Sequence, residues 1–113
     1  MTTGSAVVII SNVKAVLLFR SRVVYPERAF AELVLWRLPQ PLSGCAHSYK
    51  YRLAYVFQGQ CVVRYDNEAG KGAHVHGAGD ESKYRFVSPE RLIADFRDQI
   101  ERWNHENSDT RGS

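Results

Sequence analysis

The segment from Tyr49 to Asn67 constrains the fold of this chain more than any other part. Apolar and polar residues alternate in YKYRLAYVF and again in QCVVRYDN, with the period of a strand that has one buried face. Gln58-Gly59 lies between the two runs and suits a two-residue hairpin turn. We therefore predict a β-hairpin of Tyr49–Phe57 and Gln60–Asn67, and with it an antiparallel sheet.

A two-residue turn also predicts the register of this hairpin. It pairs Tyr51 with Asp66 and Arg52 with Tyr65, and every second residue along each strand then shares a face. The members of one predicted face are Tyr49, Tyr51, Leu53, Tyr55, Val62, Arg64 and Asp66. A slip by one residue would exchange the two faces, so the assignment of faces depends on this register.

Further strands are predicted on either side of the hairpin. Lys14–Tyr25 and Arg28–Leu38 are rich in β-branched and large apolar residues. Pro39–Ser48 contains two prolines and a glycine and is predicted to be a loop. Glu68–Lys83 is rich in glycine, so we predict a second loop there, followed by a short strand at Tyr84–Val87.

The C-terminal segment has the pattern of an amphipathic helix. Ser88 suits the N-cap, Pro89 the first helical position and Glu90 the first turn. A helix over Pro89–Trp103 would carry one apolar stripe. The stripe consists of Leu92, Ile93, Phe96, Ile100 and Trp103.

These elements predict a small α+β domain, an antiparallel sheet of about four to six strands with one C-terminal amphipathic helix packed on one face. A chain of 113 residues has room for a single core. We assign residues 14–103 to this domain, residues 1–13 to an N-terminal extension or edge strand, and residues 104–113 to a polar tail.

Charge and cysteine content give a first indication of partners and compartment. The net charge is +3, and eleven of the fifteen basic residues are Arg, whose planar fork suits phosphate or carboxylate. Cys45 and Cys61 lack zinc-finger spacing and are expected to be free thiols in the cytoplasm. No apolar run is long enough to span a membrane. We expect a cytoplasmic protein that binds something anionic.

The residues best suited to chemistry lie in the hairpin and in the predicted loop after it. Histidine is the residue type best suited to general acid–base chemistry at neutral pH, so His74 and His76, with Asp66, are the candidate catalytic residues. The candidate phosphate-binding or base-stacking residues are Lys50, Arg52, Arg64, Lys71, Tyr51 and Tyr65. Two histidines are fewer than the three or four ligands usual for a metal, so we favour acid–base chemistry without metal or other cofactor.

The same segments resemble the TumE family of toxin–antitoxin proteins. The resemblance rests on KAVLLF, FAELVLWRLPQP, HSYKYRLAYV, CVVRYDNEAGKGAHVHG, YRF and SPERLIADF, in this order, from about Lys14 to Trp103. It implies a small toxin that inhibits growth and is neutralised by a cognate helix-turn-helix antitoxin. It does not imply a particular catalytic mechanism.

Three functions fit these observations. The first is a ribonuclease acting on RNA, in which the histidines serve as general base and acid. The second is a toxin that transfers a nucleotidyl group, and the third is a non-catalytic module that binds protein or RNA. The sequence leaves open whether the sheet edges pair two copies into a homodimer.

Overall fold

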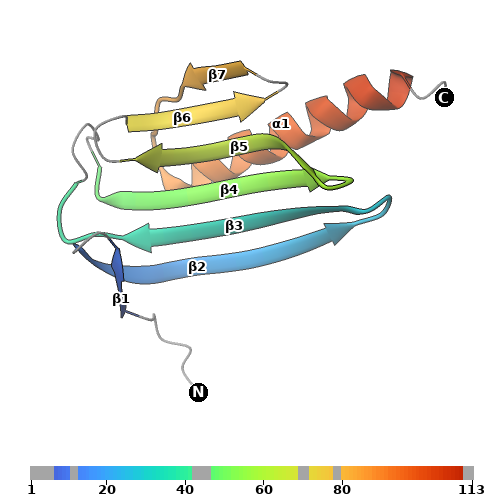
Figure 1. The fold of residues 1–113 in the computed structure, drawn as a ribbon. Coiled ribbons are helices and arrows are strands. Elements are labelled where there is room, and N and C mark those ends of the chain that lie inside the picture. Colours follow the sequence, from blue (N-terminus) through green and yellow to red (C-terminus); the bar gives the residue numbers. More distant parts are fainter. Residues whose placement is uncertain (1–6, 11–12, 42–46, 69–71, 78–79, 111–113) are drawn as a thin grey trace.

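The computed structural model describes residues 7–10, 13–41, 47–68, 72–77 and 80–110. Within these ranges the chain forms one antiparallel sheet and one helix, which confirms the predicted α+β class (Figure 1). The elements are β1 (Val7–Ile10), β2 (Val13–Tyr25), β3 (Ala29–Arg37), β4 (Tyr49–Phe57), β5 (Gln60–Glu68), β6 (Gly72–Gly77), β7 (Asp80–Lys83) and α1 (Pro89–Thr110).

The sheet is a simple meander in which each strand pairs with its neighbours in the sequence, in the order β1 to β7. The turn between β4 and β5 is the predicted one: Gln58 and Gly59 both have positive φ, at 50° and 86°. That combination gives a two-residue turn the twist that joins adjacent antiparallel strands. β1 pairs with β2 at one edge of the sheet, and β7 forms the other edge.

Helix α1 begins as the sequence predicts. The Ser88 hydroxyl accepts a hydrogen bond from the Arg91 amide at 3.1 Å, and the Ser88 carbonyl accepts one from the Leu92 amide. The helix continues to Thr110, beyond the predicted end at Trp103. Asn104 connects this extension to the sheet, because its Oδ1 accepts a hydrogen bond from the Tyr55 hydroxyl at 2.8 Å.

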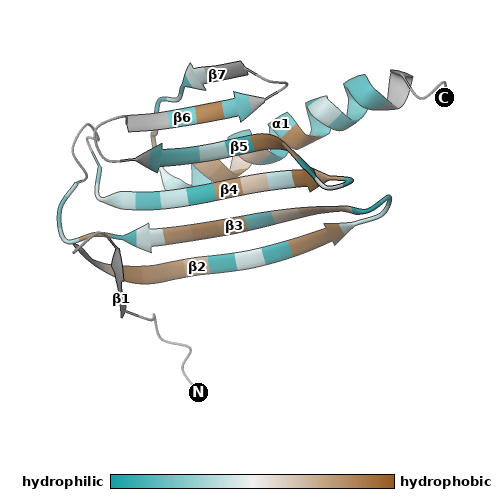
Figure 2. Ribbon diagram, in the orientation of Figure 1, coloured by the Kyte–Doolittle hydropathy of each residue, from teal (hydrophilic) through white to brown (hydrophobic). Residues whose placement is uncertain are grey.

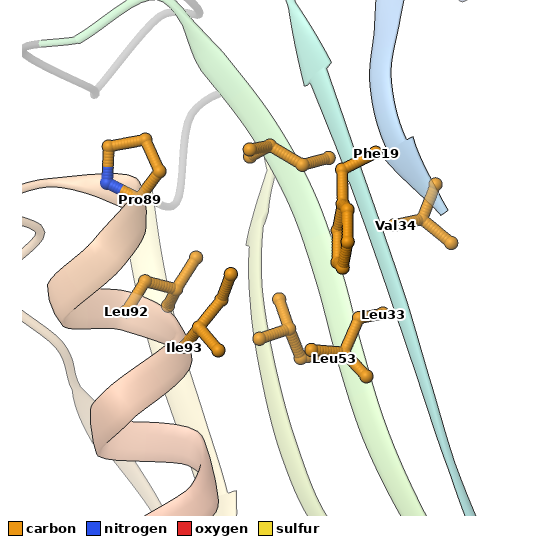
Figure 3. A pocket seen from close by; sticks show the side chains of 8 residues that line it. Phe19, Leu33, Val34, Leu53, Pro89, Leu92 and Ile93 are labelled. Atoms are coloured by element: carbon orange, nitrogen blue, oxygen red, sulfur yellow. The ribbon is translucent and has the colours of Figure 1, made fainter. Parts of the chain in front are cut away.

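The apolar stripe of α1 packs on one face of the sheet and forms the core with it. Leu92, Phe96 and Ile100 are each at most 4% exposed. Figure 3 shows Leu92 and Ile93 directed toward Leu53 and Phe19 on the strands. The space left among them is about 10 Å³, room for no more than one water molecule, so it is not a ligand site.

A bulge in the hairpin overturns the predicted register. Val56 pairs with Cys61 as expected, but Tyr55 pairs with Val63, so Val62 is an extra residue on β5. From there on the pairing is shifted by one, and Arg52 lies opposite Asp66 rather than Tyr65. The predicted face is therefore divided between the two sides of the sheet. Its β4 members Tyr51, Leu53 and Tyr55 are in the core, and its β5 members Arg64 and Asp66 are on the opposite face.

The glycine-rich segment is a second correction. It was expected to be a loop, but Gly72–Gly77 forms β6 alongside β5, and Asp80–Lys83 forms β7 alongside β6. The strand expected at Tyr84–Val87 is absent, and these residues instead lead from β7 into α1. The backbone hydrogen bonds that this segment makes with the neighbouring strands thus outweigh the low strand propensity of its glycines.

Asn67 joins the ends of β4 and β5 from inside the core. Its side chain is fully buried, and its Oδ1 accepts a hydrogen bond from the Tyr51 amide at 2.9 Å. Its Nδ2 donates to the Tyr49 carbonyl at 2.7 Å. The amide side chain therefore takes the place of backbone pairing beyond the last residue pair of the β4–β5 ladder.

We predict that Asn67→Ala lowers the free energy of unfolding by about 2–4 kcal/mol, because it leaves the Tyr51 amide and the Tyr49 carbonyl without these partners. Urea denaturation measures this change. Gln60→Ala, at an exposed strand position, is the matched control and should stay within about 0.5 kcal/mol of the wild type. Equal effects of the two substitutions would contradict the structural role of Asn67.

His47 packs into an aromatic cluster near the start of α1. Its ring stacks on Phe86 with 3.9 Å between centroids, and its Nδ1 accepts a hydrogen bond from the Tyr49 amide at 3.2 Å. Burial lowers the pKa of His47 below its ordinary value. The folded protein therefore favours the neutral imidazole.

We predict a loss of stability as the pH falls below about 6.5, the ordinary pKa of histidine. The unfolded chain binds a proton on His47 in that range and the folded chain resists it, so this contribution is present above the ordinary pKa and is lost below it. Urea denaturation at pH 7.5 and 5.5 should show a smaller difference for His47→Gln than for the wild type. An identical difference would contradict the prediction.

Candidate functional site

The bulge in β5 brings four of the predicted site residues together on the face opposite α1. Residues paired across antiparallel strands point to the same side of the sheet. Asp66 pairs with His74 and Arg64 pairs with His76, and all four lie on the side that α1 does not cover. We call this side of the sheet the open face.

Arg64, Asp66 and His76 form a connected cluster on the open face. The Arg64 Nε lies 3.1 Å from Asp66 Oδ2, and the Arg64 Nη2 lies 3.1 Å from His76 Nε2. His76 Nε2 is also 3.8 Å from Asp66 Oδ1. The three side chains are 34%, 15% and 28% exposed, so they are partly shielded yet accessible to a ligand.

The contact between Arg64 and His76 indicates the tautomer of the imidazole. A guanidinium has only donors, so at 3.1 Å its partner Nε2 must supply a lone pair. His76 is then neutral, with its proton on Nδ1. A neutral imidazole with an Nε2 lone pair on an accessible face can act as a general base once a substrate displaces the guanidinium.

His74 lies beside this cluster on the same strand. The ring centroids of His74 and His76 are 6.3 Å apart. Both imidazoles project from the same side of β6, so two groups that can exchange protons lie close together on the open face.

Two further predicted cations flank the cluster on β4. Arg52 lies opposite Asp66, is exposed, and shares the open face. Lys50 pairs with Trp36 across β3 and β4, and its Nζ donates a hydrogen bond to the Asn67 carbonyl at 2.6 Å. Arg52 is thus available to an anion, whereas Lys50 already binds the backbone. Lys71 lies outside the described residues.

The two predicted stacking tyrosines are corrected by the structure. Tyr51 is 0% and Tyr65 3% exposed, so both are core residues under α1 and cannot stack on a base. Burial, with the nearby carboxylate of Asp95, raises the pKa of Tyr65 to about 12, which keeps the phenol neutral. We remove both residues from the candidate site.

Two arginines on β2, Arg20 and Arg22, also lie on the open face and are absent from the predicted site. Arg20 pairs with Val34 and Arg22 with Glu32, so both point to the open face. The signal was present in the alternation Arg20-Ser21-Arg22 within a predicted strand, which places two cations on one side of a sheet. That Arg20 lies on the same row of the sheet as Arg52 follows only from the register of β2, β3 and β4.

Comparison with known families agrees with this architecture. The model of the family described as Toxin TumE matches residues 8–104, most of the chain. The chain belongs to the TumE toxin family. The resemblance found in the sequence is thereby confirmed, and the protein is the toxin of a toxin–antitoxin system with an antitoxin as its partner. No curated protein and no solved structure was found to match the chain.

Two further observations concern metal ligands and membrane-spanning helices in this TumE toxin. In the described ranges, no three His, Cys, Asp or Glu side chains lie close enough to hold a metal ion together. Within the same ranges, α1 is the one helix, and it lacks the apolar length required to cross a bilayer.

We predict that His76 carries its proton on Nδ1 at neutral pH, because Nε2 accepts from Arg64. Long-range ¹H–¹⁵N correlation spectra of the imidazole distinguish the two tautomers. Arg64→Met removes the donor to Nε2, so the Nδ1-protonated tautomer of His76 should become less dominant in this variant. A wild-type His76 protonated on Nε2 alone would contradict the assignment.

Proposed function

We propose that this TumE toxin is a ribonuclease that cleaves RNA on the open face by histidine acid–base chemistry without a metal ion. The observation that carries the proposal is the pairing of Arg64 with His76 and of Asp66 with His74 on one accessible face. The two imidazoles are on β6, and two arginines, Arg64 and Arg52, are at nearby positions on the adjacent strands β5 and β4. Metal-free phosphodiester cleavage uses a set of groups of this kind: a base, an acid and cations for the phosphate.

In the proposed reaction His76 is the general base. A phosphate oxygen draws the Arg64 guanidinium toward itself, and His76 Nε2 then accepts the proton of the ribose 2′-hydroxyl. The 2′-oxygen attacks phosphorus as the bond from phosphorus to the 5′-oxygen breaks. Asp66, held 3.1 Å from Arg64 and 3.8 Å from His76, orients the guanidinium and stabilises the imidazolium that forms.

His74 is the general acid of the same step. As an imidazolium it donates its proton to the departing 5′-oxygen, so the reaction yields a 2′,3′-cyclic phosphate and a 5′-hydroxyl. Arg52 and Arg64 flank the position of the phosphate and offset the negative charge that grows on its oxygens in the transition state. Toxicity would then follow from RNA cleavage in the cytoplasm.

We predict that His74→Ala and His76→Ala each reduce RNA cleavage by about 10²–10⁴-fold, the usual contribution of a positioned acid or base. Purified protein incubated with total cellular RNA, with and without EDTA, measures this. His105→Ala, an exposed histidine on α1, is the matched control and should cleave at the wild-type rate.

Thermal unfolding of each variant establishes that the fold is intact. Cleavage that persists in the double His74→Ala/His76→Ala variant, or that is abolished by EDTA, would contradict the proposal. Transfer of label from a nucleotide onto RNA or protein, in the absence of cleavage, would favour nucleotidyl transfer instead.

A further inference from the structure

The open face extends well beyond the histidines, onto β2 and β3. A row of paired residues crosses the sheet at one level: Arg20, Val34, Arg52, Asp66 and His74. Arg20 and Arg52 are both exposed and lie on either side of Val34. Within the part of the chain that the structure describes, neither guanidinium has a hydrogen-bond or carboxylate partner. Two arginines are therefore available to anions on a single row.

The spacing of the strands gives the scale of this row. Adjacent strands lie about 4.8 Å apart, so Arg20 is about 10 Å from Arg52 and about 19 Å from His74, measured between backbones. Successive phosphates of a stacked strand are about 3.4 Å apart along the axis, and more when the strand is extended. The row is thus several nucleotides long, longer than one cleaved phosphodiester needs.

A cleft of about 240 Å³ lies at the β2 end of this row. Its lining residues are Arg20, Ser21, Arg22, Glu32 and Val34. A water molecule occupies about 30 Å³ of liquid, so the cleft has room for a phosphate group with its hydration. Figure 2 shows this hydrophilic part of β2 beside the more apolar β3.

Arg22 is held in place at the edge of the cleft. Its Nη1 lies 2.9 Å from Glu32 Oε2, and its guanidinium carbon lies 4.1 Å from the centre of the Phe30 ring. The carboxylate and the ring fix the fork on the open face, so an anion meets a cation that is already oriented. Arg22 thus supplements Arg20 as a ligand of the same phosphate.

Two aromatic side chains of β3 lie on the open face between the cations of β2 and the cation of β4. Phe30 and Trp36 are half-buried and point to the open face, because their β4 partners Val56 and Lys50 do. The Phe30 ring is covered by the Arg22 guanidinium, which leaves Trp36 as the ring on which an unpaired base can stack while the arginines bind its phosphates. In an RNA duplex the bases are paired and stacked on one another, so a ring on this face can stack only on the base of an unpaired strand.

We propose that Arg20, Arg22 and Arg52 form a phosphate-binding track for single-stranded RNA, which runs across the strands from the β2 cleft to the histidines. The inference rests on the proposed ribonuclease function and names its substrate: an unpaired strand several nucleotides long, rather than a duplex or a mononucleotide. A strand anchored at β2 presents a phosphodiester to His74 and His76 at a fixed distance from the anchor.

The test measures binding and cleavage separately as the length of the RNA changes. A decanucleotide with 2′-O-methyl groups cannot be cleaved through its 2′-oxygen, so fluorescence anisotropy reports binding alone. Arg20→Ala should weaken the binding of this decanucleotide about 5- to 30-fold, the effect of losing one charge-assisted contact. The affinity for a dinucleotide should stay the same. The dependence of log K on log salt should become shallower by about 0.7.

Arg97→Ala is the matched control, since it removes the same charge from an exposed position on α1. It should change neither binding nor the salt dependence. Equal losses in the two variants, or a loss for the dinucleotide as large as that for the decanucleotide, would overturn the track. Weakened binding of the antitoxin with unchanged RNA binding in Arg20→Ala would show a protein interface and would also overturn it.

The same variants separate this inference from the ribonuclease proposal. If the protein binds the decanucleotide through Arg20 but cleaves no RNA, the cleavage proposal fails and the track remains. If RNA is cleaved but Arg20→Ala cleaves an unmodified decanucleotide and an unmodified dinucleotide at wild-type rates, the track fails and the cleavage proposal remains.

Discussion

The packing of α1 on one side of the sheet determines the role of nearly every residue in the strands. The stripe of Leu92, Phe96 and Ile100 covers Tyr51 and Tyr65, which removes these tyrosines from solvent. The other side has no described element above it (Figure 1). The charged side chains of β4, β5 and β6 described above lie on that side. Because a single helix covers one side of the sheet, that side becomes the core and the other side remains the open face.

Much of the fold could be predicted because its signals are local. The Gln58-Gly59 turn and the Ser88-Pro89-Glu90 helix start each depend on a few neighbouring residues whose backbone preferences are strong. The face of each hairpin strand could not be predicted, because one extra residue, Val62, shifts the pairing. Nothing in the composition of QCVVRYDN distinguishes a bulged strand from a regular one. The structure brings the predicted residues Arg64, Asp66, His74 and His76 together on the open face, but the predicted tyrosines lie in the core.

The glycine-rich segment shows a different limit of sequence reasoning. Glycine lowers strand propensity, but β6 pairs along its whole length with β5 and over His74–Gly77 with β7, and this tertiary pairing outweighs the local preference. The consequence for function is considerable. His74 and His76 are fixed on a strand beside Arg64 and Asp66, so the sheet sets their positions relative to these two residues.

The chemistry of the cleaved ends tests the central claim most directly, that two histidines on the open face cleave RNA through its 2′-hydroxyl. Mass spectrometry of a short RNA after incubation with the purified toxin should show a 2′,3′-cyclic phosphate on one fragment and a 5′-hydroxyl on the other. The corresponding DNA should remain intact, because it lacks the attacking oxygen. Fragments that carry a 5′-phosphate, or cleavage of the DNA, would show attack by water and contradict the account.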